Sequence, residues 1–598
     1  MTSRAPGRGS CRGEKGRRPR RLRATTLIST PPAAAVALLL LTMLLPSAAT
    51  AQVGKGEAAR IADRDSNVVR LREGNPDLTH SANMADGSWE VAYFADDKGV
   101  ALVIVDPVTG LVRESWTGYQ VAWKMARGYS GAFGHKLNAP YVFLPLCALF
   151  LIGLLDWRRL WRVANLDLLV LLAFGLSHWF FNRGEIGVSV PLQYPVLLYL
   201  LFRALWIGLR GRGEGLRPVW PVVWLLIAAL FLIGFRAGLN VADSGAIDVG
   251  YAGVVGADRI SHGDPLYGNF PDDISEGDTY GPTTYLAYVP FEAIWPWQGS
   301  WDDLPAAHGA AVTFDLATFA LLFFLGLRLR PGEAGRRLAA TLAFAWASYP
   351  YTAFALQSNS NDTLVALFLV ATLLVLARPV ARGALAALAT LTKFAPALLV
   401  PMLATYKPTP AGGTGGGGSR TTPPAGPPPP VTGPAVARFV IAFIATTALL
   451  MAWPAIDPGL ATVWDRTIGY QSGRASPFSL WGQVGGLEPL RMAILIAVAA
   501  AAVAFAFWPK HKNLTQVAAL GAALLIGLQL TAQHWFYLYI VWFYPLLLVA
   551  MATVEKRAAM PLRQEPGPSP AQSSRPCRPD SPQPPRPSPR RRLRPFRI

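Results

Sequence analysis

The stretch GLNVADSGAIDVGYAGVVGADRISHGDPLYGNFPDDISEGDTYGPTTYLAYVPFEAIWPW, residues 238–297, is a polar and acidic interval set between long apolar runs. Its tyrosines, tryptophans and prolines are typical of a segment that folds against a membrane surface rather than of a loose linker. We therefore expect the chemistry of the chain in this interval. Its carboxylates include Asp243, Asp248, Asp258, Asp264, Asp272, Asp273, Glu276 and Asp278.

The overall composition indicates an integral membrane protein with soluble appendages, because 52% of the 598 residues are hydrophobic and only 15% are charged. The net charge of +19 lies mostly at the two ends: residues 1–23 carry nine basic and one acidic residue (+8), and residues 555–598 carry eleven and three (+8). No basic stripe with interleaved aromatic residues is left in the body, so we expect no nucleic-acid partner. The three cysteines, Cys11, Cys147 and Cys577, lie in unrelated segments and predict neither disulfides nor a metal cluster.

Residues 1–51 have the basic, apolar and small-residue succession of a signal peptide, ending in the site Ala49-Thr50-Ala51. An uncleaved anchor is the alternative. Both interpretations place residue 52 outside the cytoplasm, so the predicted topology does not depend on the choice.

Residues 52–139 are predicted to form a small α+β extracytoplasmic domain. A helix is expected over Glu57 to Arg72, followed by the strand-like runs SWEVAYF, VALVIVD and LVRESW, which the turn signals DDKG and PVTG separate. The segment DPVTGLVRESWTG resembles PepSY-like small domains. No acid–base or metal-ligand spacing occurs in this region, which favours a structural or partner-binding lid over catalysis.

From Pro140 onward the apolar runs are long enough to span a bilayer, and arginines follow the end of each run that the positive-inside rule places in the cytoplasm. The predicted fold class is an all-α polytopic membrane protein with eleven or thirteen crossings. We expect three helices in 140–218, a membrane core in 219–406 with the acidic outer loop 240–305, a cytoplasmic linker in 407–434, further helices in 435–554 and a basic tail in 555–598. The linker and the tail are low-complexity segments that cannot pack a core, so disorder is expected there.

Counting the crossings requires residues 383–405 to cross the membrane twice or not at all. Lys393 and Pro396 lie in the middle of this segment, which predicts two short helices that are broken there, as a hairpin or a re-entrant loop. Broken helices in membranes usually line cavities.

Several short motifs follow one another in a recognisable order: Asp248-Val-Gly-Tyr251, Gly263-Asp264-Pro-Leu-Tyr267, TYGPTTYLAYVP, QSNSND and Lys393-Phe-Ala-Pro396. This order resembles the GT-C glycosyltransferases, and more closely their DUF2029 branch, which includes polyprenol-phosphate-mannose-dependent α-mannosyltransferases of actinobacterial envelope synthesis. In that branch an acidic residue opens the first large outer loop and is followed by a Tyr and a Gly-x-x-x-Tyr. The resemblance covers roughly residues 219–550. The chain departs from it in the polar turn SNSND, where family members often have a Gly-Gln pair, and in its extra upstream spans.

The resemblance implies a hexosyltransferase that uses a polyprenyl-phosphate sugar, with mannose as the expected hexose, and extends an extracytoplasmic envelope glycolipid, polysaccharide or glycoprotein. Such chemistry needs a carboxylate base for the acceptor hydroxyl and cations for the departing phosphate. It requires no nucleotide-binding Gly-rich loop, and no such loop is present. Asp248 is the expected base, with a solvated acid or helix N-cap as its alternative role, and Asp243, which also suits helix capping, is the second candidate.

The remaining candidates are substrate-binding residues, and no metal or cofactor is expected. Lys393 is a candidate for the lipid phosphate, although it could instead pair with a buried acid such as Asp315 or snorkel. The other candidates also have plainer roles, as a surface arginine, interfacial anchors or a turn residue. They are Tyr251, Tyr267, Asp278, Tyr280, Arg474, His534 and, as a weaker candidate, Arg236.

Two other classes of function stay open. A transporter would use the broken helix with Lys393 and Asp315, although no inverted repeat is visible in the sequence. A membrane sensor or scaffold would leave the 240–305 loop merely structural.

Overall fold

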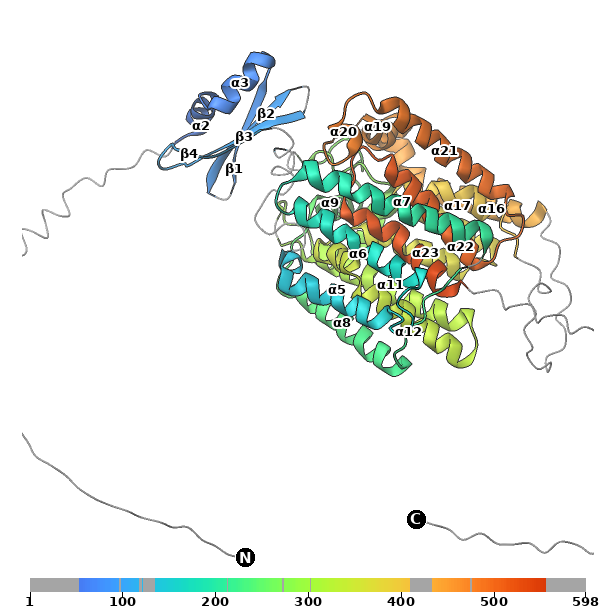
Figure 1. Cartoon of the computed structure of the whole chain (residues 1–598). Coiled ribbons are helices and arrows are strands. Elements are labelled where there is room, and N and C mark those ends of the chain that lie inside the picture. Colours follow the sequence, from blue (N-terminus) through green and yellow to red (C-terminus); the bar gives the residue numbers. More distant parts are fainter. Residues whose placement is uncertain are drawn as a thin grey trace, which may run out of the picture. The chain divides into compact units, whose positions relative to one another are not determined.

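The computed structural model describes residues 53–85, 87–95, 98–117, 121, 135–211, 213–271, 274–301, 303–408, 433–473 and 476–554. The chain divides into two compact units, Met1–Thr117 and Gly118–Ile598 (Figure 1). The predicted signal peptide, the basic tail and nearly all of the predicted linker lie outside the described residues.

The first unit contains two helices and a four-stranded antiparallel sheet with the strand order β1-β2-β3-β4. The helices are α2 (Lys55–Asp63) and α3 (Ser66–Gly74), and the strands are β1 (Thr79–Ala85), β2 (Ser88–Ala95), β3 (Lys98–Val105) and β4 (Val112–Thr117). Val91 of β2 lies opposite Val103 of β3, and both are fully buried against Ala58, Ala62 and Val68 of the helices. The predicted α+β meander is therefore present, and this compact unit ends at Thr117 rather than at residue 139.

Two details of this unit differ from the expectation. The predicted single helix is two helices, because the Asp65 side chain accepts a hydrogen bond from the Asn67 backbone N–H and starts α3. The strand β1 was not predicted, since its sequence THSANMA lacks an alternating apolar pattern. Pairing along β2 supplies its backbone hydrogen bonds instead.

The second unit is helical in its described residues. Its first helices are η1 (His135–Asn138), α5 (Pro140–Leu154), α6 (Val163–Phe181), α7 (Ile186–Arg210), α8 (Val222–Ala242), α9 (Asp248–His262), α10 (Pro282–Glu292), α11 (Pro305–Leu329), α12 (Gly332–Ser348), α13 (Pro350–Gln357) and α14 (Asp362–Leu374). They are followed by α15 (Pro379–Thr390), η3 (Ala395–Leu399), α16 (Val400–Ala404), α17 (Gly433–Pro454), η4 (Ala455–Gly459), α18 (Leu460–Trp464), η5 (Asp465–Gly469), α19 (Tyr470–Gly473), α20 (Leu480–Gln483), α21 (Glu488–Phe507), α22 (Leu514–Leu530), η6 (Tyr537–Tyr539) and α23 (Ile540–Thr553).

Six helical runs in the described part of the chain are long and apolar enough to cross a membrane. They are Val163–Phe181, Ile186–Arg210, Val222–Ala242, Pro305–Leu329, Gly433–Ser472 and Glu488–Phe507. Further apolar helices are shorter, among them Pro140–Leu154, Leu514–Leu530 and Tyr537–Thr553. The helices lie alongside one another (Figure 1), as a polytopic membrane protein requires.

The helix boundaries differ from the expected spans in two places. The apolar run over residues 338–356 is divided into α12 and α13 at Pro350, whose ring prevents the helix from continuing through Tyr349. The expected outer loop 457–488 contains the short consecutive helices α18, η5 and α19, which run from Leu460 to Gly473.

Segments that were predicted to lie on the same side of the membrane meet one another at the same end of the bundle. At one end, Asn240 bonds to Asn359 (2.8 Å) and the Gln483 side chain donates to the Ile186 carbonyl (3.2 Å). At the other end, the Gln516 side chain donates to the Gly208 carbonyl (2.9 Å). Ile186 and Gly208 mark opposite ends of α7, so the two sets of loops are separated by the length of this helix.

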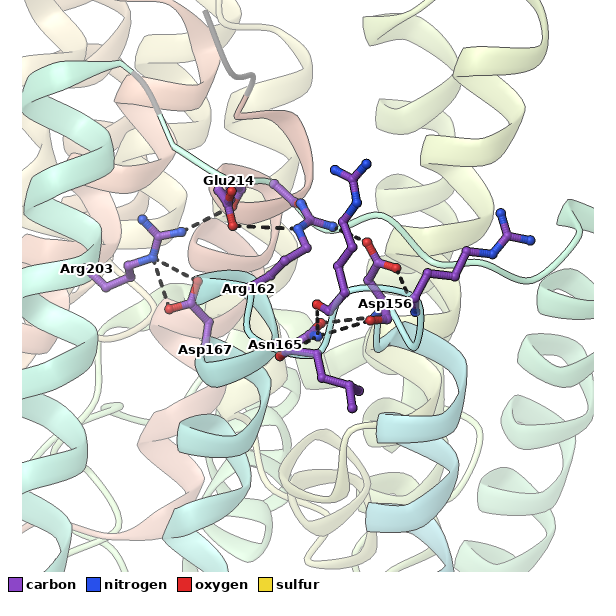
Figure 2. A network of polar contacts seen from close by, with 10 residues as sticks. Asp156, Arg162, Asn165, Asp167, Arg203 and Glu214 are labelled. Carbon is purple, nitrogen blue, oxygen red and sulfur yellow. Dashed lines mark hydrogen bonds and ion pairs between the residues drawn. The ribbon is translucent and has the colours of Figure 1, made fainter.

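At the predicted cytoplasmic end, buried arginines form a polar network with acids and backbone carbonyls (Figure 2). The Arg203 guanidinium contacts both oxygens of Asp167 at 2.8 and 3.0 Å, and Arg162 contacts Asp156 at 2.8 Å. The side chain of Asn165 donates to the carbonyls of Asp156, Arg159 and Leu160. Arg162 also donates to the Gly215 carbonyl (2.6 Å) and Arg203 to the Glu214 carbonyl (3.2 Å), so the arginines tie the start of α6 and the helix α7 to the segment that follows α7.

In the first unit, Asp106 organises the turn between β3 and β4. Its carboxylate accepts hydrogen bonds from the backbone N–H groups of Val108 and Thr109 (both 2.8 Å) and from Arg113. These bonds, the two from the backbone first, lower the pKa of Asp106 to about 2. Because the pKa is depressed in the folded state, the ionised carboxylate stabilises the turn above the unfolded value of about 4. This stabilisation is lost as the pH falls through about 2.

We expect Asp106→Ala to accelerate amide hydrogen exchange in residues 106–113 of the full-length chain near neutral pH. Relative to wild type at each pH, the acceleration should shrink as the pH falls from about 4 towards 2. Asp77→Ala, at an exposed acid of the same unit, is the control. An acceleration of equal size at pH 7 and pH 2 would show that the Asp106 charge does not hold the turn.

We expect Asp167→Ala to lower the thermal midpoint of the detergent-solubilised chain strongly, because it leaves the Arg203 guanidinium buried without its carboxylate. Removing one partner of such a pair costs about 3–5 kcal/mol. The double variant Asp167→Leu/Arg203→Met should recover most of the loss, and Glu185→Ala, at an exposed acid, should have little effect. A double variant as unstable as the single one would argue against the pair as the source of the effect.

Candidate functional site

A cavity of about 310 Å³ lies at the end of the bundle where the predicted outer segments meet. Its wall combines two cations, Lys393 and Arg491, with the aromatic rings of Tyr280, Tyr539 and Trp542. The other polar residues of the wall are Gln471, Gln529, Gln533, His534, Thr279 and Thr531. Cationic groups beside aromatic rings and amides can hold an anionic, hydroxyl-rich ligand.

The position of Lys393 follows from a break between two helices. The helix α15 ends at Thr390 and η3 begins at Ala395, as the sequence around Lys393 and Pro396 predicted. The first turn of α10 satisfies the freed carbonyls, because Thr283 N–H donates to the Leu391 carbonyl (3.1 Å) and the Thr284 hydroxyl donates to the Thr392 carbonyl (2.7 Å).

Gly281 allows this close approach of the two segments. A Cβ atom at Gly281 would lie 2.0 Å from the Leu391 carbonyl oxygen, so no side chain fits there. The motif Tyr280-Gly281-Pro282 is therefore directly coupled to the helix break that presents Lys393.

Asp362, the first residue of α14, is the acid that Lys393 contacts. The ammonium lies 2.5 Å from Asp362 Oδ1, and the Trp542 indole N–H donates to the same oxygen at 2.7 Å. The hydroxyl of Ser360 donates to the second oxygen. The ammonium also lies 4.9 Å from the centre of the Tyr280 ring and 5.4 Å from that of Trp542. Both charged groups are buried, and Lys393 alone of the two lines the cavity.

The alternative role of Lys393, pairing with a buried acid, is observed, but the acid is Asp362 and not Asp315. Asp315 Oδ1 instead contacts the Arg236 guanidinium at 2.8 Å and accepts from the Trp346 indole at 2.9 Å, within the core of the bundle. Arg236 is thus a buried ion-pair partner rather than an interfacial anchor. Lys393 and Asp315 belong to two different ion pairs, since the register of α14 brings Asp362 to the lysine.

Asp278 and Tyr267 hold the segment that carries Tyr280. The Arg466 guanidinium of η5 contacts both Asp278 oxygens, at 2.7 and 2.8 Å, and the Gly268 backbone N–H donates to Asp278 at 2.6 Å. The Tyr267 hydroxyl donates to the Tyr280 carbonyl at 2.9 Å. Neither Asp278 nor Tyr267 is among the described residues of the cavity wall, so both act as supports for Tyr280.

Asp248, Asp243 and Tyr251 lie around the start of α9, and none of them is among the described residues that line the Lys393 cavity. Asp248 is the exposed first residue of α9. Asp243 forms an ion pair with Lys136, and the buried Tyr251 stacks on Trp301 with ring centres 4.9 Å apart.

The two chain neighbours of Asp248 bond to the polar turn 358–362. Ile247 N–H donates to the Ser358 carbonyl (3.1 Å), and the Asn361 side chain donates to the Val249 carbonyl (3.0 Å). Asp362 at the end of this turn contacts Lys393. The SNSND turn therefore connects the exposed acid to the lysine of the cavity.

His534 lines the cavity, and its Nδ1 lies 2.9 Å from the Ser476 hydroxyl. The predicted residue Arg474 lies outside the described residues. Arg491 was not predicted as a site residue. It contacts Glu488 and lies one turn into the apolar helix α21. A charged residue at the start of an apolar helix is typical of a membrane boundary and could have indicated it. Asp362 was visible as the last residue of QSNSND, but nothing local to it indicates its partner.

The described residues contain no group of three or more His, Cys, Asp and Glu side chains that could hold a metal ion.

We expect Asp278→Asn to loosen the contact between η5 and the segment before α10, because it removes a charged acceptor from Arg466. Hydrogen bonds to charged groups contribute about 1.5–3 kcal/mol. Hydrogen exchange of the full-length chain in lipid nanodiscs should accelerate over residues 274–281 and 465–471. Glu276→Gln is the matched control, since Glu276 is half exposed and lies 3.6 Å from the same arginine. Equal acceleration in both variants would contradict a specific role for Asp278.

Compared with protein-family models and with curated proteins, the sequence matches none.

Proposed function

We propose that the chain is a multi-pass membrane glycosyltransferase of the cell membrane. In this proposal it transfers a hexose, with mannose as the first candidate, from a polyprenyl-phosphate sugar to an envelope glycolipid, polysaccharide or glycoprotein on the extracytoplasmic side. The observation that carries the proposal is the cavity in which Lys393 and Arg491 lie beside the aromatic rings of Tyr280, Tyr539 and Trp542.

The cations of this cavity suit the phosphate of a lipid-linked donor. An ammonium has three donors, so Lys393 can bond to a phosphate oxygen while it retains its contact with Asp362. Arg491 is held by Glu488, which is half exposed, and its guanidinium also has further donors for an anion. Both groups would stabilise the charge that develops on the phosphate as the sugar leaves.

The rest of the cavity wall suits the other parts of such a donor. Aromatic faces can pack against the C–H surface of a sugar ring, and the amides of Gln471, Gln529 and Gln533 can bond to its hydroxyl groups. Leu495 and Leu528 supply an apolar side to the cavity. Leu495 belongs to α21, one of the helices long and apolar enough to cross a membrane, so a prenyl chain could leave the cavity along this helix.

Asp248 is proposed as the base that takes the proton of the acceptor hydroxyl. It is exposed, so an acceptor from the aqueous phase can reach it. The turn 358–362 separates it from Lys393, and the reaction requires the donor sugar and the acceptor to meet beside this turn. Asp362 is the alternative carboxylate, although it is buried, Lys393 and Trp542 contact one of its oxygens and the Ser360 hydroxyl donates to the other.

A transporter is favoured by one observation, that two of the ion pairs buried within the bundle are Arg236–Asp315 and Lys393–Asp362. Transport would depend on both pairs and would tolerate a change at the exposed Asp248. A sensor or scaffold would tolerate changes at all of these positions.

The test is sugar transfer by the purified full-length chain in lipid nanodiscs, with radiolabelled polyprenyl-phosphate mannose or glucose and a membrane lipid extract as acceptor. Asp248→Asn should lower the transfer rate at least about 100-fold, as expected for the loss of a general base. Asp264→Asn, at another exposed acid of the same segment, should leave the rate unchanged. The paired variant Lys393→Met/Asp362→Asn, which removes both charges together, should mainly weaken donor binding.

Loss of transfer in Asp362→Asn but not in Asp248→Asn would overturn the assignment of the base. Absence of transfer by the wild type with either donor would contradict the glycosyltransferase proposal itself. Elution as a single species in size-exclusion chromatography and an unchanged thermal midpoint identify the variants that are folded.

A further inference from the structure

We propose that a second cavity, of about 410 Å³, is a carbohydrate-binding subsite that holds the acceptor glycan. It lies between the end of α10 and the start of α11, away from the cavity that contains Lys393. The residues that give it chemical character are Trp295, Trp297, Gln298 and Asp303, and Val254 and Pro305 contribute to its wall. Naming the ligand as the acceptor rests on the proposed function, whereas the carbohydrate class follows from the wall itself.

The two tryptophans are held in position by their surroundings. The indole N–H of Trp297 donates to the Ser300 carbonyl at 3.0 Å, and its ring lies 6.1 Å from that of the buried Tyr251. A Cβ atom at Gly309 would lie 2.8 Å from the ring of Trp295, so the glycine allows this ring to pack on α11. Trp295 nevertheless keeps 44% of its surface exposed. An indole that is anchored and still exposed offers a preformed aromatic platform.

The polar groups lie at the rim of this platform. Gln298 uses its side-chain N–H to bond to the Pro296 carbonyl at 2.9 Å, which orients the amide. Asp303 adds an exposed carboxylate next to Leu304, which is buried and has a positive φ of 44°. For a leucine this backbone conformation is strained and persists only because packing holds it, as is common at binding sites.

This combination matches a pyranose better than it matches a lipid or an apolar peptide. One face of a pyranose presents C–H groups that pack on an aromatic ring, and its edge presents hydroxyl groups that bond to amides and carboxylates. The cavity volume also lies within the range of about 300–1,000 Å³ that is usual for ligand sites. An acyl chain has no groups that could form hydrogen bonds with the side chains of Gln298 and Asp303.

The location agrees with a role in placing the acceptor. Val254 belongs to α9, the helix that begins with Asp248. Val254 follows Asp248 by six positions along the helix, which corresponds to a rise of roughly 9 Å. Tyr251, between these two residues in the sequence, contacts both Trp297 and Trp301. A glycan bound against the tryptophans would therefore lie along the helix whose first residue is the proposed base.

The test is binding of mannotriose to the full-length chain in lipid nanodiscs without any donor, measured by saturation-transfer NMR and by intrinsic tryptophan fluorescence. Methyl α-mannoside and methyl β-glucoside are measured alongside. We expect binding by the wild type and about tenfold weaker binding by Trp295→Ala, in line with the loss of one aromatic contact of roughly 1.4 kcal/mol. Trp295→Phe, which keeps a platform, and Gln298→Ala should give intermediate losses.

Trp224→Ala is the matched control, because Trp224 is 62% exposed but lies in the first turn of α8, at the opposite end of that helix from the acidic segment. Unchanged sugar binding in Trp295→Ala and Gln298→Ala, or no binding of any of the three sugars by the wild type, would overturn the subsite. The tryptophans would then be interfacial anchors. Because no donor is present, a chain that binds mannotriose but transfers no sugar would contradict the proposed function and leave the subsite in place.

Discussion

The arrangement of the helices depends on the cost of taking a carboxylate out of water. Four of the buried carboxylates among the described residues each contact a cation from another segment of the chain: Asp167, Asp278, Asp315 and Asp362. An unpaired charge in such a position would cost several kcal/mol, so each pair strongly restricts the register between two segments. Apolar packing brings the helices together, and these pairs select which residues face one another.

The pair between Lys393 and Asp362 has the largest consequence for the site. It lies where three features meet: the break after α15, the polar turn 358–362 and the helix α23, which contributes Trp542. Because Asn361 of the same turn also bonds to the start of α9, a change in the turn would move both the lysine and the segment around Asp248. The five residues of the turn 358–362 thus connect the region of the exposed Asp248 to the buried Lys393.

The sequence was sufficient for the features that arise locally. Apolar runs and arginines predicted the helices and the two sets of loops, and the pair Lys393 and Pro396 predicted the broken helix. The sequence was not sufficient to predict which side chains contact one another when tertiary packing determines the contact. Asp315 and Asp362 are both acids in apolar surroundings, and only the packing of α14 against the break shows that Asp362 contacts the lysine. The strand β1 was missed for a similar reason, since its stability comes from pairing with β2 rather than from its own pattern.

The helix α10 separates the two cavities that border the acidic interval. Tyr280, just before α10, borders the cavity with the two cations, whereas Trp295, just after it, borders the cavity with the tryptophans. The eleven residues of the helix hold these two ends roughly 16 Å apart. Under the proposed function, the lipid-linked donor and the water-exposed glycan would need different surroundings, and this helix would keep their two binding sites apart. The rings of Tyr288 and Tyr285 in α10 pack directly on Gly253 and Gly256 of α9, where a Cβ atom would lie within 3 Å of these rings. This close packing of the two helices fixes the position of Asp248, the first residue of α9, relative to both cavities.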